Sequence, residues 1–288
     1  MKKPFKLLIV VLLLLGVSAA LLTMYIQNHS IPMMEPKGLI AMKERDLIYT
    51  SAILMLLVVI PVIVITIVFA WKYREQNERA KHAPDWEHNN IAECCWWGVP
   101  VVIVAILAVI TFRTCFELDP YKPLEHEKNP IEIQVVALDW KWLFIYPEYG
   151  IASVNFFQIP EKTPIKFAIT SDAPMNSFWI PALGSQIYAM PAMRTELNLI
   201  ANEVGSFRGA SSNISGKGFA GMYFTVKSST DEEFERWVSS VKQSSKTLGW
   251  DEYNKLAEPS EYHPAASYVL TQPDLFDQIM NKYYPPQK

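Results

Sequence analysis

The stretch LIYTSAILMLLVVIPVIVITIVFAW, residues 47–71, decides the first half of the fold. It contains no charged side chain and is long enough to cross the ~30 Å hydrocarbon layer of a membrane, even with Pro61 inside it. A second uncharged run, CCWWGVPVVIVAILAVITF, occupies residues 94–112. Two such runs in succession are poorly explained as buried core helices. Residues 47–113 are therefore predicted to form a two-helix transmembrane hairpin.

The charges around the two spans predict the topology of the hairpin. Residues 72–93, between the spans, hold basic side chains that the positive-inside rule assigns to the cytoplasm. Basic side chains also occur on the other side of the first span, within residues 21–46, so this rule alone gives a small margin. Residues 1–20 decide the orientation, because a basic start, an apolar run and small residues resemble a secretory signal peptide, either cleaved or retained as a helix. We therefore expect a cytoplasmic loop at 72–93, a periplasmic lead-in at 21–46, and a periplasmic domain after Phe116.

The composition excludes several other classes of protein. A net charge of −3 without a basic stripe argues against a nucleic-acid partner. The three cysteines, Cys94, Cys95 and Cys115, lie in or beside the second span, where a helix would hold Cys115 about 30 Å from the other two, too far for a disulfide. The residues after Cys115 therefore offer neither a disulfide scaffold nor a cysteine-ligated metal centre. No nucleophile–base pair or phosphate-binding glycine loop is visible, so we expect no catalytic residue.

From Ile131 onward the pattern changes to short β-branched segments separated by proline-containing turns, which is typical of a β-sandwich or barrel. Residues 117–228 are predicted to form this all-β domain. After Ser229 the pattern becomes helical, with Thr230 as a candidate cap, so residues 229–288 are predicted as an extension of short helices. Strands are expected at residues 131–138, 141–146, 151–158, 164–170, 176–181, 195–200 and 221–226.

Two segments of the β domain carry the spacing of a metal site. The first, SDAPMNSFWIP, covers residues 171–181, and the second, SSNISGKGFAGM, covers residues 211–222. Their spacing resembles the copper-binding framework of the haem–copper oxidase subunit II family. In that family the loop reads Cys-x-Glu-x-Cys-Gly-x-x-His-x-x-Met, and an upstream His-Ser-Phe-x-x-Pro supplies another histidine. Laid on this chain, the six ligand positions are Asn176, Ser211, Asn213, Ser215, Phe219 and Met222.

Of these six side chains, only Met222 is of the residue type that the family uses as a ligand. A binuclear copper site needs bridging thiolates and terminal imidazoles. A serine hydroxyl is a hard, neutral oxygen, and phenylalanine has no lone pair to donate. We therefore expect no metal here, with Met222 packed in the core. The loop itself is interpreted either as a vestigial copper loop or as an ordinary polar loop.

The resemblance covers about residues 35–284 and includes long phrases such as LDWKWLFIYPE at 138–148 and LGSQIYAM at 183–190. It implies a cupredoxin-like sandwich, and the lost ligands place the chain in the quinol oxidase branch, near subunit II of the cytochrome bo type. A copper-free subunit II offers no entry for electrons from cytochrome c, so the implied donor is a quinol. Members of this branch usually carry an acylated cysteine after the signal sequence, and residues 1–93 contain none.

The resemblance implies a bacterial inner-membrane complex that oxidises quinol, reduces oxygen to water and translocates protons. Its haems and copper would lie in subunit I, which would also bind the quinol. This chain would be a non-catalytic structural and assembly subunit that contacts subunit I, the smaller membrane subunits and lipid. The alternative is a membrane-anchored, cupredoxin-like binding protein of the periplasm without an oxidase partner. The apolar faces of the hairpin favour a larger membrane partner.

Glu93 opens the second span and has two interpretations. The resemblance makes it the counterpart of a subunit II glutamate at the cytoplasmic entrance of a proton-uptake channel, where a carboxylate can collect protons from water. The residues alone equally allow a helix N-terminal carboxylate that the helix dipole stabilises. A separate expectation concerns Trp140 and Trp142, which should alternate along a strand and pack on one face.

Overall fold

The computed structural model describes residues 16–18, 20–21, 23–25, 31–77, 80 and 88–283. Its contacts divide the chain into two compact units. One comprises residues 43–123, and the other comprises residues 1–42 together with residues 124–288. Most of the predicted signal peptide at 1–20 lies outside the described residues, as does part of the predicted loop at 72–93.

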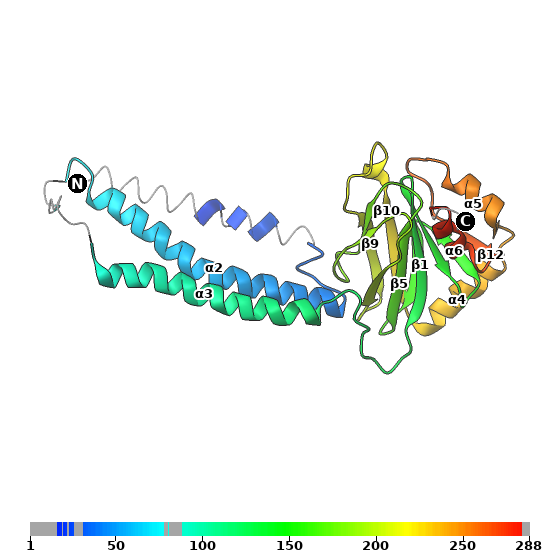
Figure 1. The fold of residues 1–288 in the computed structure, drawn as a ribbon, viewed down its shortest axis with the longest axis horizontal. Coiled ribbons are helices and arrows are strands. Elements are labelled where there is room, and N and C mark those ends of the chain that lie inside the picture. Colours follow the sequence, from blue (N-terminus) through cyan, green and yellow to red (C-terminus); the bar gives the residue numbers. More distant parts are fainter. Residues whose placement is uncertain are drawn as a thin grey trace, which may run out of the picture. The chain divides into compact units, whose positions relative to one another are not determined.

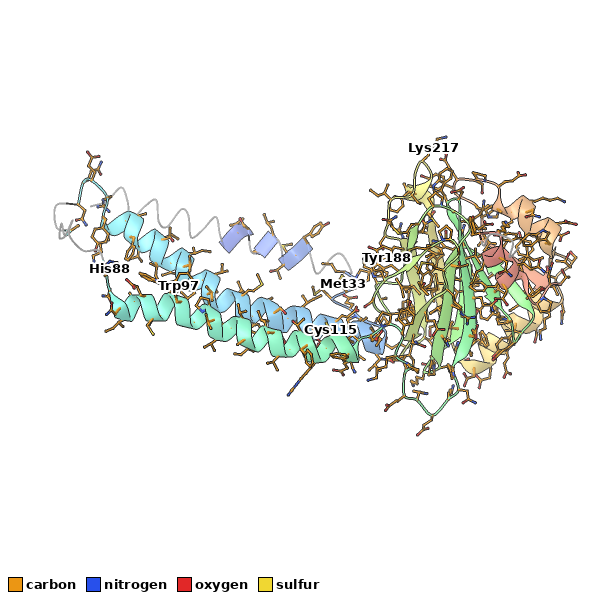
Figure 2. The ribbon with its side chains drawn as sticks, in the orientation of Figure 1. Met33, His88, Trp97, Cys115, Tyr188 and Lys217 are labelled. Atoms are coloured by element: carbon orange, nitrogen blue, oxygen red, sulfur yellow. The ribbon has the colours of Figure 1, made fainter. Side chains whose placement is uncertain are left out.

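Two long helices contain the predicted spans. Helix α2 runs from Leu39 to Lys72 and helix α3 from Asn90 to Glu117, and both are long and apolar enough to cross a membrane. Each helix extends beyond its uncharged run, because an α-helix continues into the interface wherever no residue stops it. An ion pair joins Lys43 in α2 to Glu117 in α3, so the helices lie antiparallel and side by side (Figure 1). In Figure 2, His88 and Trp97 lie toward one end of this hairpin and Cys115 toward the other.

The second unit is a sandwich of two sheets. In spatial order the seven-stranded sheet contains β11 (Thr247–Leu248), β12 (Ala266–Leu270), β3 (Ile151–Val154), β2 (Lys141–Tyr146), β1 (Ile131–Leu138), β5 (Pro164–Ser171) and β8 (Thr195–Ile200). The five-stranded sheet contains β4 (Phe156–Pro160), β10 (Tyr223–Ser229), β9 (Gly205–Ser211), β6 (Asn176–Trp179) and β7 (Ile187–Ala189). The β domain is thus the predicted cupredoxin-like sandwich, and Figure 1 shows β9 and β10 facing β1 and β5.

Aromatic rings fill the space between the two sheets. The ring of Phe224 lies 5.2 Å from that of Phe178, stacked with an interplanar angle of 2°, and 5.8 Å from that of Trp142. Phe144 and Phe157 belong to the same cluster, with ring centroids 4.5 Å apart. All five side chains are buried. Aromatic side chains bury more apolar area than other residues, so this cluster is the main source of stability between the sheets.

Two residues with a left-handed backbone, Asn155 and Trp140, lie between consecutive strands. Asn155 has a φ of 52°, and it divides the predicted strand 151–158 into β3 and β4, which belong to different sheets. Asparagine tolerates this left-handed conformation better than most residues. Trp140 has a φ of 63° and lies in the turn between β1 and β2. The expectation that Trp140 alternates with Trp142 along one strand is therefore wrong.

The C-terminal segment adds a third layer and is only partly helical. Helix α4 (Asp231–Lys242) is capped by the preceding residue, Thr230. The Thr230 hydroxyl accepts a hydrogen bond from the Glu233 N–H, as predicted for a cap. Helices α5 (Trp250–Ala257) and α6 (Leu275–Asn281) contribute apolar side chains to a second core on the outer face of β1 and β2. Strands β11 and β12 were not predicted from the sequence. They add to the seven-stranded sheet, so residues 229–288 are not purely helical.

The aromatic cluster gives a test of the fold. Phe224→Ala removes a fully buried ring, so it should lower the free energy of unfolding by about 3–5 kcal/mol. The adjacent Tyr223 is 44% exposed and is the matched control, whose replacement by alanine should cost less than about 1 kcal/mol. Thermal unfolding of the full chain in detergent, followed by circular dichroism, compares the two. Equal shifts of Tm would contradict this placement of the core.

Candidate functional site

Two neighbouring strands position the residues that occupy the ligand spacing. Asn176 begins β6 and Ser211 ends β9, and the two strands are antiparallel partners, with Phe178 opposite Ser211. The chain then forms a loop of residues 212–222 that ends at the start of β10. Backbone bonds close this loop, because the Ser211 N–H donates to the Met222 carbonyl at 3.1 Å.

A buried hydrogen bond lies at the centre of this site. The Ser211 hydroxyl donates to Asn176 Oδ1 at 3.0 Å, and Asn176 Nδ2 donates to the Pro174 carbonyl at 2.7 Å. The two residues are 6% and 1% exposed, respectively. Buried polar groups cost free energy unless they are hydrogen-bonded, and here each side chain satisfies the other. The strand pairing therefore places two neutral polar groups where the resemblance implies a thiolate and an imidazole.

The remaining positions surround this pair. Asn213 Nδ2 donates to the Met175 carbonyl at 2.8 Å, and Ser215 Oγ lies 4.0 Å from the sulfur of Met222. Met222 is buried, as expected for core packing. Phe219 begins the 3₁₀ turn η1 (Phe219–Gly221) and is half-buried. The Ser211 hydroxyl also lies 3.2 Å from the Asn213 carbonyl, so hydrogen bonds link five of the six predicted positions, and the sixth lies in the same loop.

This set of side chains does not fit a copper centre. Hydroxyl and amide groups already bonded to one another replace the soft ligands that copper prefers, and one thioether remains. Within the described part of the chain, no three His, Cys, Asp or Glu residues are grouped so as to hold a metal ion.

The sequence analysis missed the residue that covers the loop. The indole N–H of Trp140 donates to the Ser215 carbonyl at 3.2 Å. Its ring lies against Gly218, where a Cβ atom would stand 2.4 Å from the ring, and beside Gly216, whose φ is +116°. Both glycines are required, one by the close approach of the ring and the other by its backbone conformation. The sequence shows two glycines around Lys217 but does not indicate that Trp140 packs on them.

Glu93 lies in the other unit, at the N-terminus of α3. Asn89 caps this helix by accepting the Ala92 N–H at 3.0 Å, and Glu93 Oε1 lies 3.4 Å from the backbone N of Asn89. His88 Nδ1 lies 3.3 Å from the same oxygen. The Glu93 side chain is 38% exposed, so the carboxylate is accessible to water as well as capping the helix. This geometry is compatible with both interpretations of Glu93.

A second cluster fixes the C-terminal layer to the sandwich. The carboxylate of Asp172, just after β5, accepts hydrogen bonds from the Tyr253 and Tyr283 hydroxyls and pairs with the Lys282 amine at 2.6 Å. Lys282 also lies 4.7 Å from the ring of Tyr253 and 5.1 Å from that of Trp250. Burial and the nearby Asp172 charge raise the pKa of both tyrosines well above its ordinary value. The Asp172 side chain is only 7% exposed, and these three partners satisfy its carboxylate.

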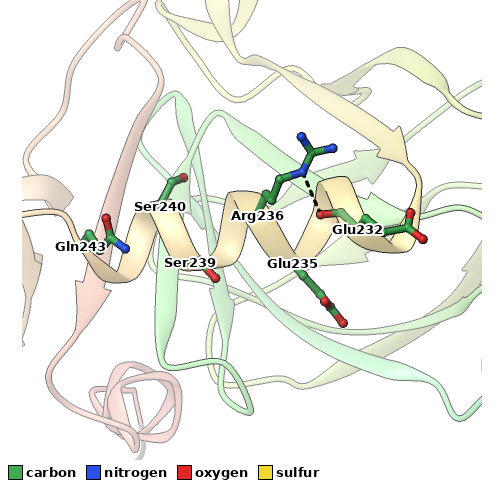
Figure 3. A pocket seen from close by; sticks show the side chains of 6 residues that line it. All are labelled: Glu232, Glu235, Arg236, Ser239, Ser240 and Gln243. Atoms are coloured by element: carbon green, nitrogen blue, oxygen red, sulfur yellow. Dashed lines mark hydrogen bonds between the residues drawn. The ribbon is translucent and has the colours of Figure 1, made fainter.

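A hollow of about 470 Å³ runs along the surface of α4 (Figure 3). The side chains that line it all project from α4, and Arg236 Nε donates to the carbonyl of Glu232 at 3.3 Å. No second element contributes a converging group to it, so the hollow offers no catalytic arrangement. Its lining consists of Glu232, Glu235, Arg236, Ser239, Ser240 and Gln243.

Comparison with known proteins identifies the class to which this fold and site belong. The family model for the periplasmic domain of cytochrome c oxidase subunit II matches residues 149–229, and the model for the COX aromatic-rich motif matches residues 242–287. The class is therefore that of membrane-anchored subunit II proteins of terminal oxidases. More particularly, relatives about 50% identical over most of its length show that the chain belongs to the cytochrome bo(3) ubiquinol oxidase subunit 2 family.

Two relatives of known family support this assignment, and each covers most of the chain. A cytochrome bo(3) ubiquinol oxidase subunit 2 from Pseudomonas putida is 51% identical over 87% of this chain and 80% of its own length. A ubiquinol oxidase subunit 2 from Acetobacter aceti is 50% identical over 93% of this chain and 87% of its own length. The solved periplasmic domain of cytochrome oxidase subunit II from Bradyrhizobium japonicum is 25% identical, with a TM-score of 0.38 over 41% of this chain and 96% of that one. Two apolar helices followed by such a domain fit an inner-membrane protein.

The Asp172 cluster predicts a specific response to alkaline pH. A tyrosine whose pKa is raised on folding adds stability that is fully present below its ordinary pKa of 10.0, and that stability is lost as pH rises through the raised value. The Tm of the full chain should therefore fall above pH 10, and Tyr253→Phe should make this fall shallower. At neutral pH the same variant should lose about 1–3 kcal/mol through the missing hydrogen bond. Tyr262→Phe, at an exposed position, is the control and should follow the parent chain.

Proposed function

We propose that this chain is a copper-free subunit II of a bacterial respiratory quinol oxidase, and that it serves structure and assembly rather than electron transfer. The observation that carries the proposal is the Ser211–Asn176 hydrogen bond, which fills the ligand positions with neutral, mutually satisfied groups. Without thiolates or imidazoles the domain has no centre that could accept an electron. The names of the relatives agree with a quinol oxidase, and no observation favours a free-standing binding protein.

The redox groups are assigned to partners. Haems and copper would lie in subunit I, which would receive electrons from quinol, so cytochrome c would not be a donor. Within the described residues, the apolar stretches of the two helices are left uncovered by the rest of the chain. This supports membrane contacts with subunit I, the smaller membrane subunits and lipid. The connection at 72–93 would face the cytoplasm, and the sandwich would face the periplasm.

Glu93 is proposed as a proton-collecting carboxylate at the cytoplasmic edge of the complex. Its side chain is partly exposed at the positive end of α3, with His88 3.3 Å away as a second titratable group. A partly hydrated carboxylate beside an imidazole can exchange protons with water and pass them toward a membrane partner. Simple helix capping alone would not affect turnover, and this difference makes the role testable.

The Glu93 role predicts a change in activity without a change in assembly. Glu93→Ala should lower quinol-driven oxygen consumption per haem several-fold in the purified complex, while the haem content stays normal. Glu75→Ala changes another exposed acidic residue in the described part of the connection and should leave turnover unchanged. Normal turnover of Glu93→Ala at normal haem content would remove the proposed role.

The copper-free site predicts that the old ligands can be restored. A chain carrying Asn176→His, Ser211→Cys, Asn213→Glu, Ser215→Cys and Phe219→His should bind copper and turn purple, because the loop keeps the required spacing. The parent chain should bind none, as measured by elemental analysis after dialysis. A control with the same changes except the two cysteines should also lack the purple colour. Stoichiometric copper in the parent chain would contradict the proposed function.

A further inference from the structure

Residues 258–263, Glu-Pro-Ser-Glu-Tyr-His, connect α5 to β12 and are termed the strap. The strap has no regular secondary structure, yet it is held at both ends. Asn155 Nδ2 donates to the His263 carbonyl at 2.8 Å, and the Ser260 N–H donates to the Asp139 carbonyl at 3.4 Å. Bonds to two separate positions of the sandwich, Asn155 and Asp139, indicate that its course is specified.

The buried amine of Lys141 is the strongest of these attachments. Lys141 is 1% exposed, and its Nζ donates to the Glu258 carbonyl at 2.7 Å and to the Ser260 hydroxyl at 2.5 Å. Burial lowers the pKa of this amine, against the opposing effect of the Asp139 and Glu258 charges. Burying an ammonium group is costly unless its hydrogen bonds are made. The strap supplies two of them, so strap and amine depend on each other.

The same strap also contacts the loop of residues 212–222. The ring of Tyr262 lies against Gly221, where a Cβ atom would stand 2.8 Å from the ring. Glu261 forms an ion pair with Lys217 at 3.0 Å. Trp140, which directly precedes Lys141 in the sequence, packs on Gly218 and donates a hydrogen bond to the Ser215 carbonyl. Trp140 and the strap therefore both contact the loop. Trp140 directly precedes β2, and the strap is hydrogen-bonded to Lys141, the first residue of β2.

We propose that the strap, anchored by Lys141, braces the loop of residues 212–222 in place of a bound metal. The inference rests on the proposed absence of copper, which leaves the loop without the crosslink that ligand spacing of this kind would otherwise provide. Hydrogen bonds of Ser211 and Asn213 hold the start of the loop, whereas Ser215 and Met222, farther along it, approach only to 4.0 Å. The contacts of Tyr262, Glu261 and Trp140 supply the missing restraint.

Amide hydrogen exchange of the full chain in detergent tests the brace. Lys141→Met keeps the length of the side chain and removes the amine, so peptides covering residues 212–222 and 258–263 should exchange about tenfold faster. Tyr262→Ala, at a 64% exposed position, should accelerate exchange in the loop without endangering the fold. Lys255→Gln, on the exposed face of α5, is the matched control and should change neither segment. Peptides from β1 and α4 should stay protected in all three variants.

The outcomes separate the brace from the copper-free site. Faster exchange of the loop in both Lys141→Met and Tyr262→Ala supports the brace. Unchanged loop exchange in Tyr262→Ala overturns it, even if Lys141→Met proves too unstable to interpret, because the ring is the direct contact. Copper content is measured on the same samples. Copper in the parent chain would overturn the proposed function, whereas an unbraced loop in a copper-free chain would overturn only this inference.

Discussion

The hydrogen bond between Ser211 and Asn176 is the interaction on which the interpretation of this domain depends. It joins β9 to β6 at the point where the resemblance places a metal, and it uses groups that carry no charge. Two consequences follow from the chemistry. The site offers copper neither a thiolate nor an imidazole, and the loop of residues 212–222 is held by protein contacts. The glycines under Trp140 and Tyr262 are the local sequence adaptation to those contacts.

Elements with strong local signals were predicted well from the sequence. The uncharged runs 47–71 and 94–112 lie within α2 and α3, and β1, β2 and β8 have the predicted bounds, because hydrophobic length and alternation act over a few residues. Strands β7 and β9 were missed because they are short or rich in small polar residues. Strand β12 was missed for another reason, since its pairing with β3 joins residues more than a hundred positions apart.

The residues at the candidate site could be named from the sequence, but the contacts that hold the loop in place could not. Motif spacing named six positions, and in the structure hydrogen bonds join Ser211 to Asn176, Asn213 and Met222, and Met222 to Ser215. Nothing in that spacing indicates Trp140, whose left-handed backbone takes it out of the strand pattern, or Lys141, whose burial depends on a strap more than a hundred residues away. Long-range contacts of this kind arise from the fold as a whole, so periodicity and local motifs do not contain them.

The two units of the chain solve different physical problems. The sandwich has a core of its own, because its aromatic side chains are buried between the sheets and the Asp172 carboxylate and the Lys141 amine are paired. The hairpin does not, since its helices leave their long apolar faces uncovered and need lipid or other helices around them. A self-sufficient domain on a hairpin that requires partners suits a subunit whose assembly is determined within the membrane. In such a subunit the proposed loss of copper would remove an electron path without removing the reason to retain the fold.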